Sequence, residues 1–312
     1  MSVRLRQAWL GVLRRCGRKS FVTTSGLGHR FLCHIGDFLG ESPYYNRDVF
    51  RVELEVCAAW LRGEDNPMVF DVGANVGFWS THLAQMIATK SPQIYAFEPV
   101  APTLSKLVES VERLDLVSTV RPVAAAVLDV PRSVRLSYSP RDSLFAQVSN
   151  HGLNSRVGER LVHAAGTTLD EFTSSLDLMP TFVKIDVEGS ELAVLQGARR
   201  LLACENSPAL MLEYNPTTLA EAGASAAALQ ELLEGYMLRY IDDFEGQRRP
   251  IGDVITSLAE LSWVCNILAI PEKPGMEARC LTAFEAARTR CPTEARKPNL
   301  LKRLAVALHG RR

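Results

Sequence analysis

The ten residues Val183 to Leu192, which read VKIDVEGSEL, decide how the rest of this chain is interpreted. Apolar residues alternate there with three charged ones, Lys184, Asp186 and Glu188. Alternate residues of a strand point to the same face, so these charges share one side. A strand covered on both faces should be apolar throughout, and burial of unpaired charge is unfavourable by several kcal/mol. The pattern therefore predicts a strand whose end leaves the core at a functional edge.

Strands and helices alternate on both sides of this stretch. Apolar runs predict strands at 68–71, 93–98, 120–128, 182–186, 209–213, 237–241 and 263–270. Helical spacing of apolar residues predicts helices at 78–88, 102–114, 191–202 and 225–234. This order predicts an α/β fold with an open, mostly parallel sheet and helices on both faces. The last two strands are expected to pair as an antiparallel hairpin at one sheet edge.

The segment 130–165 is less regular than its surroundings. One strand is expected at 134–138, and the polar stretch 140–160 is rich in Gly, Asn and Ser. Loops of that length in compact domains usually have a function. We interpret 140–160 as a lid or substrate loop.

Composition excludes several classes of protein. The chain has 312 residues, 47% of them hydrophobic, and 35 basic residues balance 35 acidic ones. The balance argues against a nucleic-acid partner, and no apolar run reaches the roughly 18 residues of a membrane span. Seven cysteines without a CxxC pair indicate ordinary thiols in a reducing compartment, which predicts a cytoplasmic protein. The sequence has no HExxH or similar spacing, so no metal site is expected from motifs.

The N-terminus is basic. Residues 1–36 contain seven Lys and Arg and no acid before Asp37. A transit peptide fits this composition, and so does a basic helix that contacts a membrane surface or a partner. The third alternative is a solvated helix that packs on the body. We divide the chain into a basic extension and lead-in at 1–50, a main domain at 51–271 and a basic tail at 272–312.

A glycine turn separates the first strand from its helix. It reads DVGANVG, from Asp71 to Gly77. Gly73 permits a tight turn and a close approach of the backbone to a ligand, and Gly77 lets the helix pack close to the strand. The next strand ends at Glu98, where an acid can accept hydrogen bonds from both hydroxyls of a ribose. These features predict a nucleoside cofactor.

The turn also bears on which nucleoside is bound. Dinucleotide sites have G-x-G-x-x-G, whereas this turn has D-x-G-x-x-x-G and lacks the middle glycine. An acid at the strand end disfavours a pyrophosphate and suits a ligand with an amino group. The residues therefore favour S-adenosylmethionine over NAD. A nicotinamide-dependent oxidoreductase and a non-catalytic cofactor-binding module remain as alternatives, and a glycine turn is also an ordinary structural device.

Four motifs in order resemble a known family. They are VFDVGANVGFWS (69–80), YAFEPVAPT (95–103), TTLDEF (167–172) and VKIDVEGSELAVLQGA (183–198). Over about residues 50–271 the chain resembles the FkbM-type family of S-adenosylmethionine-dependent methyltransferases. The resemblance implies a class I methyltransferase fold, which is Rossmann-like, with a seven-stranded sheet whose last strand is antiparallel. It also implies O-methylation of a hydroxyl on a natural product or sugar, so we expect a small-molecule acceptor such as a glycan or secondary metabolite.

The resemblance implies roles for particular residues. Asp71, Gly73, Asn75 and Gly77 should line the methionine end of the cofactor, and Glu98 should hold the ribose. The adenine contact normally follows the third strand, where this chain has only alanines, at 124–126. Contact with the adenine would then be apolar or through the backbone.

The charged strand is expected to end at the cofactor cleft, because ligands of open α/β sheets lie outside the carboxyl ends of the strands. Asp186 is our candidate to orient or deprotonate the acceptor hydroxyl, and Glu188 either assists it or caps the next helix. Lys184 is expected to pair with one of the acids and lower its pKa, or to extend along a sheet face. Glu191 should stabilise the helix N-terminus. Glu213 also faces the cleft, and Asp186, Glu188 and Glu213 together could hold a divalent ion.

Overall fold

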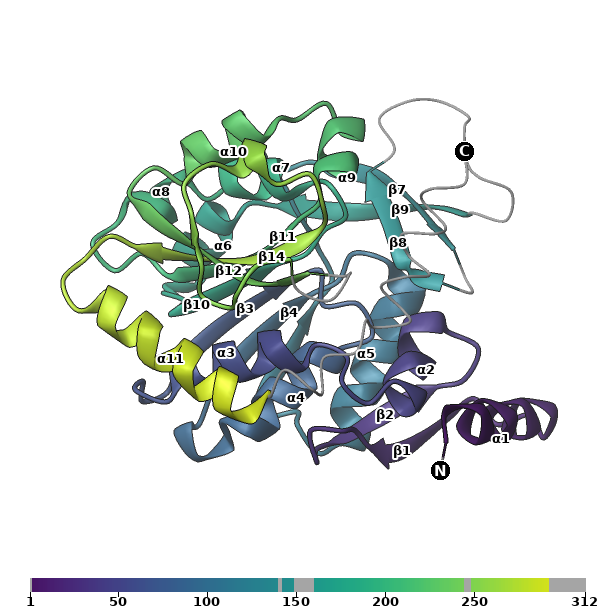
Figure 1. The fold of residues 1–312 in the computed structure, drawn as a ribbon. Coiled ribbons are helices and arrows are strands. Elements are labelled where there is room, and N and C mark those ends of the chain that lie inside the picture. Colours follow the sequence, from purple (N-terminus) through teal and green to yellow (C-terminus); the bar gives the residue numbers. More distant parts are fainter. Residues whose placement is uncertain (1, 140–141, 149–159, 244–247, 292–312) are drawn as a thin grey trace.

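The centre of the structure, a computed structural model, is an eight-stranded sheet in the order β13-β12-β14-β11-β10-β3-β4-β5 (Figure 1). The structure describes residues 2–139, 142–148, 160–243 and 248–291. The strands are β3 Met68–Val72, β4 Gln93–Phe97, β5 Val120–Val123, β10 Phe182–Ile185, β11 Ala209–Tyr214, β12 Tyr236–Asp243, β13 Val254–Ile255 and β14 Cys265–Pro271. Neighbours from β5 to β11 are parallel, and β14 is antiparallel to β11 and β12.

The expected mostly parallel sheet is thus confirmed. The last two predicted strands, β12 and β14, pair antiparallel toward one edge of the sheet as expected, with β14 next to β11. The one difference is β13, an eighth strand of two residues at this edge that was not predicted.

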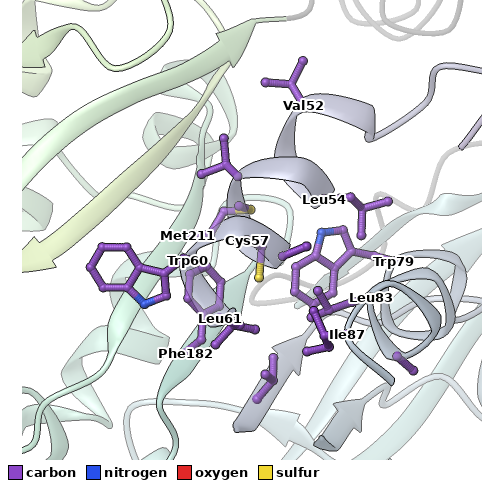
Figure 2. Packing of buried hydrophobic residues seen from close by; sticks show 14 of the residues in the cluster. Val52, Leu54, Cys57, Trp60, Leu61, Trp79, Leu83, Ile87, Phe182 and Met211 are labelled. Atoms are coloured by element: carbon purple, nitrogen blue, oxygen red, sulfur yellow. The ribbon is translucent and has the colours of Figure 1, made fainter. Parts of the chain in front are cut away.

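Helices cover both faces of the sheet (Figure 1). One face packs against α3 Arg51–Leu61, α4 Phe78–Met86, α5 Ala101–Arg113 and α11 Met276–Arg290. The other packs against α6 Leu169–Leu176, α7 Glu191–Gln196, α8 Arg199–Ala203 and α10 Ala226–Leu232. Figure 2 shows the first face, where Trp60 on α3 lies near Phe182 and Met211 of the sheet, and Leu83 lies beside Trp79 on α4.

The single helix expected at 191–202 is two helices, α7 and α8. At Gly197, between them, a Cβ would overlap with the carbonyl oxygen of Leu128, so the chain passes close to another segment at this point. The carboxylate of Asp170 then accepts hydrogen bonds from the backbone N–H groups of Arg200 and Leu201, at 2.9 and 2.8 Å. This cap begins a new helix.

A second sheet replaces most of the expected irregular region. Its order is β6-β9-β7-β8, with strands β6 Ala126–Val127, β7 Ser133–Ser139, β8 Asp142–Val148 and β9 Arg160–Thr167. The prediction of a loop over 140–160 is therefore wrong for 142–148, and 149–159 lies outside the described residues. The apolar cluster of this sheet includes Val100, two residues after Glu98, so the sheet stands beside the carboxyl end of β4.

The N-terminal and C-terminal segments both contact the main sheet's helices. The strands β1 Ser20–Thr24 and β2 Arg30–His34 form a hairpin, and Phe31 packs edge-on against Phe78 of α4 at 5.4 Å. The helices α1 Val3–Arg15 and α2 Phe38–Tyr45 flank this hairpin. Within the expected basic tail, α11 packs against α3. Among the helices that the structure describes, none is both long and apolar enough to span a bilayer.

Candidate active site

The predicted site residues gather at the carboxyl ends of the parallel strands. Gly73 follows β3, Glu98 follows β4, Asp186 follows β10 and Glu213 is near the end of β11. The strand order places these four ends side by side in the sequence β4, β3, β10, β11. This is the edge at which open α/β sheets bind their ligands.

The glycine turn lies in contact with the end of β10. Gly73 has a φ of +87°, and a Cβ at this position would overlap with the carbonyl oxygen of Asp186. Gly77 has a φ of +82°, and a Cβ there would overlap with the Leu107 side chain of α5. Only glycine fits both conditions without strain. The two glycines thus let the turn pack directly on the end of β10 and on α5.

Glu98 lies beside this turn, as the sequence predicted. Its carboxylate accepts hydrogen bonds from the backbone N–H groups of Asn75, at 3.1 Å, and Val100, at 2.8 Å. Burial raises the pKa of Glu98 to about 7, although both hydrogen bonds act to lower it. Each carboxylate oxygen has a further lone pair available to a ligand.

Asp71 is fully buried and is bonded within the protein. Ser80 donates a hydrogen bond to its Oδ2 at 2.6 Å, and Lys184 Nζ lies 3.3 Å from its Oδ1. Its carboxylate therefore faces α4 and β10. The predicted contact of Asp71 with the methionine end of a cofactor remains a prediction.

Lys184 joins the two halves of the site. Its Nζ lies 3.0 Å from Asp186 Oδ2 as well as 3.3 Å from Asp71 Oδ1, and 5.7 Å from the centre of the Trp79 ring. Burial alone would lower the pKa of Lys184, but the two carboxylates outweigh burial and hold this pKa above its ordinary value. The expected pairing is confirmed, with two acids instead of one.

Three carboxylates meet next to this ion pair, those of Asp186, Glu188 and Glu213, which we call the acidic cluster. Each offers an oxygen within 4.8 Å of the others. The Asp186 side chain is 25% exposed, whereas Glu213 is only 9% exposed. Burial and the neighbouring acids raise the pKa of Glu213 well above its ordinary value. Sequence reasoning placed these residues at the cleft, and the structure brings all three together.

The turn that presents Glu188 is held by Glu191. Glu188 has a φ of +52°, and Gly189 follows with a φ of +100°. The buried Glu191 carboxylate accepts from the N–H groups of Val187, at 3.2 Å, and Gly189, at 3.1 Å. Burial raises the pKa of Glu191 to about 7. Besides its expected place at a helix N-terminus, Glu191 therefore fixes the loop that presents Glu188.

Further polar side chains lie on β14 and β12, the strands beyond β11 in the sheet. Asn266 of β14 pairs in register with Glu213 and with Asp242 of β12. Its Nδ2 donates to Asp242 Oδ1 and to Glu53 Oε1 of α3, both at 2.9 Å. These three residues were missed in the sequence. A signal was present, because 236–243 ends in two acids just as the other strands end in acids.

The alanines expected to lie near the adenine, at 124–126, follow β5. Ala124 is exposed, and Ala126 already belongs to β6. The carbonyl oxygen of Val123 accepts from the N–H of Glu98 at 3.0 Å, which links the ends of β4 and β5. An apolar or backbone contact at 124–126 stays a prediction.

Chemically, the site has two parts. Around β3 and β4 lie the glycine turn and a carboxylate that can accept from hydroxyl groups. Around β10, β11 and β14 lie carboxylates and an amide, which are hydrogen-bond acceptors for hydroxyl donors. Asp186 lies between the two parts and touches the glycine turn through its backbone.

Comparison with known proteins gives concordant matches. A family model described as the methyltransferase FkbM domain matches residues 71–240. A hexuronic acid methyltransferase, AglP of Haloferax volcanii, is 31% identical over 173 residues, which is 55% of this chain and 62% of that protein. The chain thus spans less than two thirds of this relative.

Solved structures with a related fold are more distant in sequence. Methyltransferase FkbM from Methylobacillus flagellatus KT is 19% identical with a TM-score of 0.42, over 66% of this chain and 43% of that one. A SAM-dependent methyltransferase from Agrobacterium tumefaciens is 10% identical with a TM-score of 0.44, over 82% of this chain and 71% of that one.

Proposed function

The chain belongs to the FkbM methyltransferase domain family, and from this premise we propose that it transfers a methyl group from S-adenosylmethionine to a hydroxyl oxygen. The observation that carries the proposal is the position of Asp186. This acid, 25% exposed, lies at the carboxyl edge of the sheet in contact with the glycine turn. A group that accepts a proton thus stands next to the expected cofactor position.

The residues on the β3 and β4 side fit this cofactor. The turn from Gly73 to Gly77 stands at the carboxyl end of β3, where open α/β sheets bind their ligands, and the Glu98 carboxylate beside it could accept from ribose hydroxyls. When bound, S-adenosylmethionine supplies an electrophilic methyl group. Asn75 is held in the turn by its backbone N–H bond to Glu98, so the same carboxylate shapes the turn and serves the ribose.

On the acceptor side, Asp186 would hold the hydroxyl and accept its proton as the oxygen forms its new bond to carbon. Lys184, whose Nζ lies 3.0 Å from Asp186 Oδ2, fixes the direction of that carboxylate. Alignment of the hydroxyl with the methyl group supplies much of the rate in a direct displacement. Base catalysis contributes further.

The acceptor is proposed to be a sugar or another small polyhydroxyl compound. The wall formed by Glu213, Asn266 and Asp242 consists of two carboxylates and an amide on neighbouring strands, which together offer acceptors and donors to hydroxyl groups. The Haloferax volcanii relative is a hexuronic acid methyltransferase, and this similarity supports a sugar as the acceptor. Oxygen as the methylated atom follows from the hydroxyl-rich substrate class that such a wall suits.

A binding experiment separates this proposal from its alternatives. In titration calorimetry, the full chain should bind S-adenosylhomocysteine and not NADH. A labelled-methyl screen of the producing cell's extract should then reveal an acceptor. Binding of NADH alone would favour the oxidoreductase, and cofactor binding without any methyl transfer would favour a non-catalytic module.

Glu98 supplies a sharper prediction for the same titration. Ribose hydroxyls donate to the ionised carboxylate, whose pKa burial raises to about 7 in the free protein. Affinity for S-adenosylhomocysteine should therefore fall about tenfold per pH unit below pH 7, because Glu98 must lose a proton on binding. Glu98→Gln should bind roughly 10- to 100-fold more weakly at pH 8 and lose this pH dependence. The exposed Glu112→Gln is the matched control. A pH profile that is the same in Glu98→Gln and the parent would contradict the role of Glu98.

A further inference from the structure

The acidic cluster has the composition and spacing of a cation site. Hard divalent cations prefer carboxylate oxygens. Two oxygens that share one calcium ion at about 2.4 Å are at most about 4.8 Å apart, and the oxygens of Asp186, Glu188 and Glu213 lie within 4.8 Å of one another. A cluster of acids alone does not make a site, however, because acids at a cleft also serve water and substrates.

The second observation is the state of Glu213. Its side chain is nine-tenths buried, yet within the described part of the chain its carboxylate has no hydrogen-bond donor and no ion-pair partner. Two other buried acids of the site have partners: Ser80 and Lys184 contact Asp71, and two backbone N–H groups donate hydrogen bonds to Glu191. A buried carboxylate without a partner is costly. It is directed into a cluster with two more carboxylates.

We propose that Asp186, Glu188 and Glu213 bind one hard divalent cation of the Mg²⁺, Mn²⁺ or Ca²⁺ kind. Lys184 and Glu191 would preorganise the site: the first fixes Asp186 at 3.0 Å, and the second holds the loop of Glu188. Such ions take six or more oxygen ligands. Three carboxylates therefore leave positions for water and for oxygens of a polyhydroxyl acceptor.

The role of the ion rests on the proposed function, whereas its binding does not. A cation that touches the acceptor oxygen makes the hydroxyl more acidic. The ion would lower the pKa of the acceptor hydroxyl, and Asp186 would accept the proton. The ion would favour acceptors with two neighbouring hydroxyls, because both hydroxyl oxygens could bind it at the same time.

The test measures binding directly. After treatment with a chelator, the full chain should bind one Mn²⁺ by electron paramagnetic resonance titration, and excess Mg²⁺ or Ca²⁺ should displace it. Glu213→Gln, which keeps the shape of the side chain, should weaken Mn²⁺ binding at least tenfold. The matched control is Glu231→Gln, which changes an exposed acid on α10 and should bind Mn²⁺ as the parent does.

Thermal unfolding shows whether the variant is merely misfolded. In chelator, Glu213→Gln should melt at the same or a higher temperature than the parent, because the repulsion between Glu213 and the neighbouring acids is removed. Added Mn²⁺ should raise the melting temperature of the parent only. Absence of Mn²⁺ binding in the parent, or equal binding in Glu213→Gln, would overturn the ion site. Titration with S-adenosylhomocysteine is independent of both results, so failure of the ion leaves the proposed function standing.

A separate observation concerns α1. It lies at the outside of the molecule (Figure 1), and Leu10 is its one buried side chain. The opposite side exposes Leu5, Trp9 and Val12, at 59%, 47% and 43%. These positions are i, i+4 and i+7, which form one face of a helix. We call them the α1 ridge.

The surroundings of the α1 ridge are basic. Residues 1–19 contain six Lys and Arg and no acid, and Arg4 and Arg15 on the helix are exposed. A helix with an apolar face and arginines lies in the interface of an anionic bilayer, where each basic residue contributes about 1 kcal/mol. We infer that α1 docks the protein on an anionic lipid surface, with the α1 ridge inserted.

Vesicle sedimentation tests the docking. The full chain should bind phosphatidylglycerol-containing vesicles, much less those of phosphatidylcholine alone, and binding should weaken as salt increases. The triple variant Leu5→Ser, Trp9→Ser, Val12→Ser should lose at least tenfold in binding. The matched control replaces three exposed apolar residues elsewhere: Val117→Ser, Leu176→Ser, Leu281→Ser. Equal binding of both variants would overturn the inference, and so would a dimer of the parent that only the triple variant of the ridge abolishes.

Discussion

Asp186→Asn should lower the turnover number roughly 10²- to 10⁴-fold, the usual contribution of a positioned base. An amide cannot accept the hydroxyl proton, although it keeps nearly the same shape. The cofactor turn touches the backbone of residue 186 and not its carboxylate, so affinity for S-adenosylhomocysteine should change little. Initial rates of labelled methyl transfer to the acceptor fraction of a cell extract measure the effect.

Two comparisons support the interpretation of that rate. Asp177→Asn alters an exposed acid far from the cleft, at a left-handed position that asparagine tolerates, and should leave the rate unchanged. Melting temperature and cofactor affinity of Asp186→Asn identify any loss due to unfolding. Turnover equal to that of the parent would remove Asp186 from the mechanism.

Lys184→Met should destabilise the fold by about 3–5 kcal/mol, the usual cost when one partner of a buried ion pair is removed. The lysine is buried between Asp71 and Asp186, at 3.3 and 3.0 Å. Without it, the hydroxyl of Ser80 is the one donor left to the fully buried Asp71 carboxylate among the residues that the structure describes. Denaturant unfolding monitored by circular dichroism gives the free energy of unfolding.

The reference for this effect is an exposed pair of the same type. Lys90 lies 3.2 Å from Asp65, whose side chain is 89% exposed, so Lys90→Met should cost less than about 1 kcal/mol. The double variant Lys184→Met, Asp71→Asn should recover part of the loss, since it also removes the stranded charge. A loss below 1 kcal/mol in Lys184→Met would show that the ion triad does not stabilise the fold.

Much of this architecture could be predicted from the sequence, because the strands end in residues that a core does not accept. VKIDVEGSEL does form the fourth parallel strand along the chain, and Asp186 and Glu188 follow it at the carboxyl edge, whereas Lys184 is buried within it. The class I methyltransferase fold implied by the resemblance is confirmed, with seven strands in the expected arrangement and β13 added at one edge. The glycine turn was also placed correctly between β3 and α4.

What the sequence could not reveal depends on register between distant segments. Lys184 pairs in register with Asp71, more than a hundred residues earlier, and only this neighbour explains why a lysine is buried there. Asn266 acquires its role in the same way, from Glu213 and Asp242 on either side. The second sheet was missed because β8 and β9 pair mainly with β7, so polar residues are tolerated along them.

The contact between Gly73 and the carbonyl oxygen of Asp186 has a consequence for how this protein can diversify. It packs the glycine turn directly on the backbone that carries the proposed base, and any side chain at position 73 would overlap with that backbone. The outer strands β14 and β12, which present Asn266 and Asp242, stand apart from that contact. Acceptor preference should therefore be tunable by substitutions on these outer strands, and libraries aimed at new substrates should begin there.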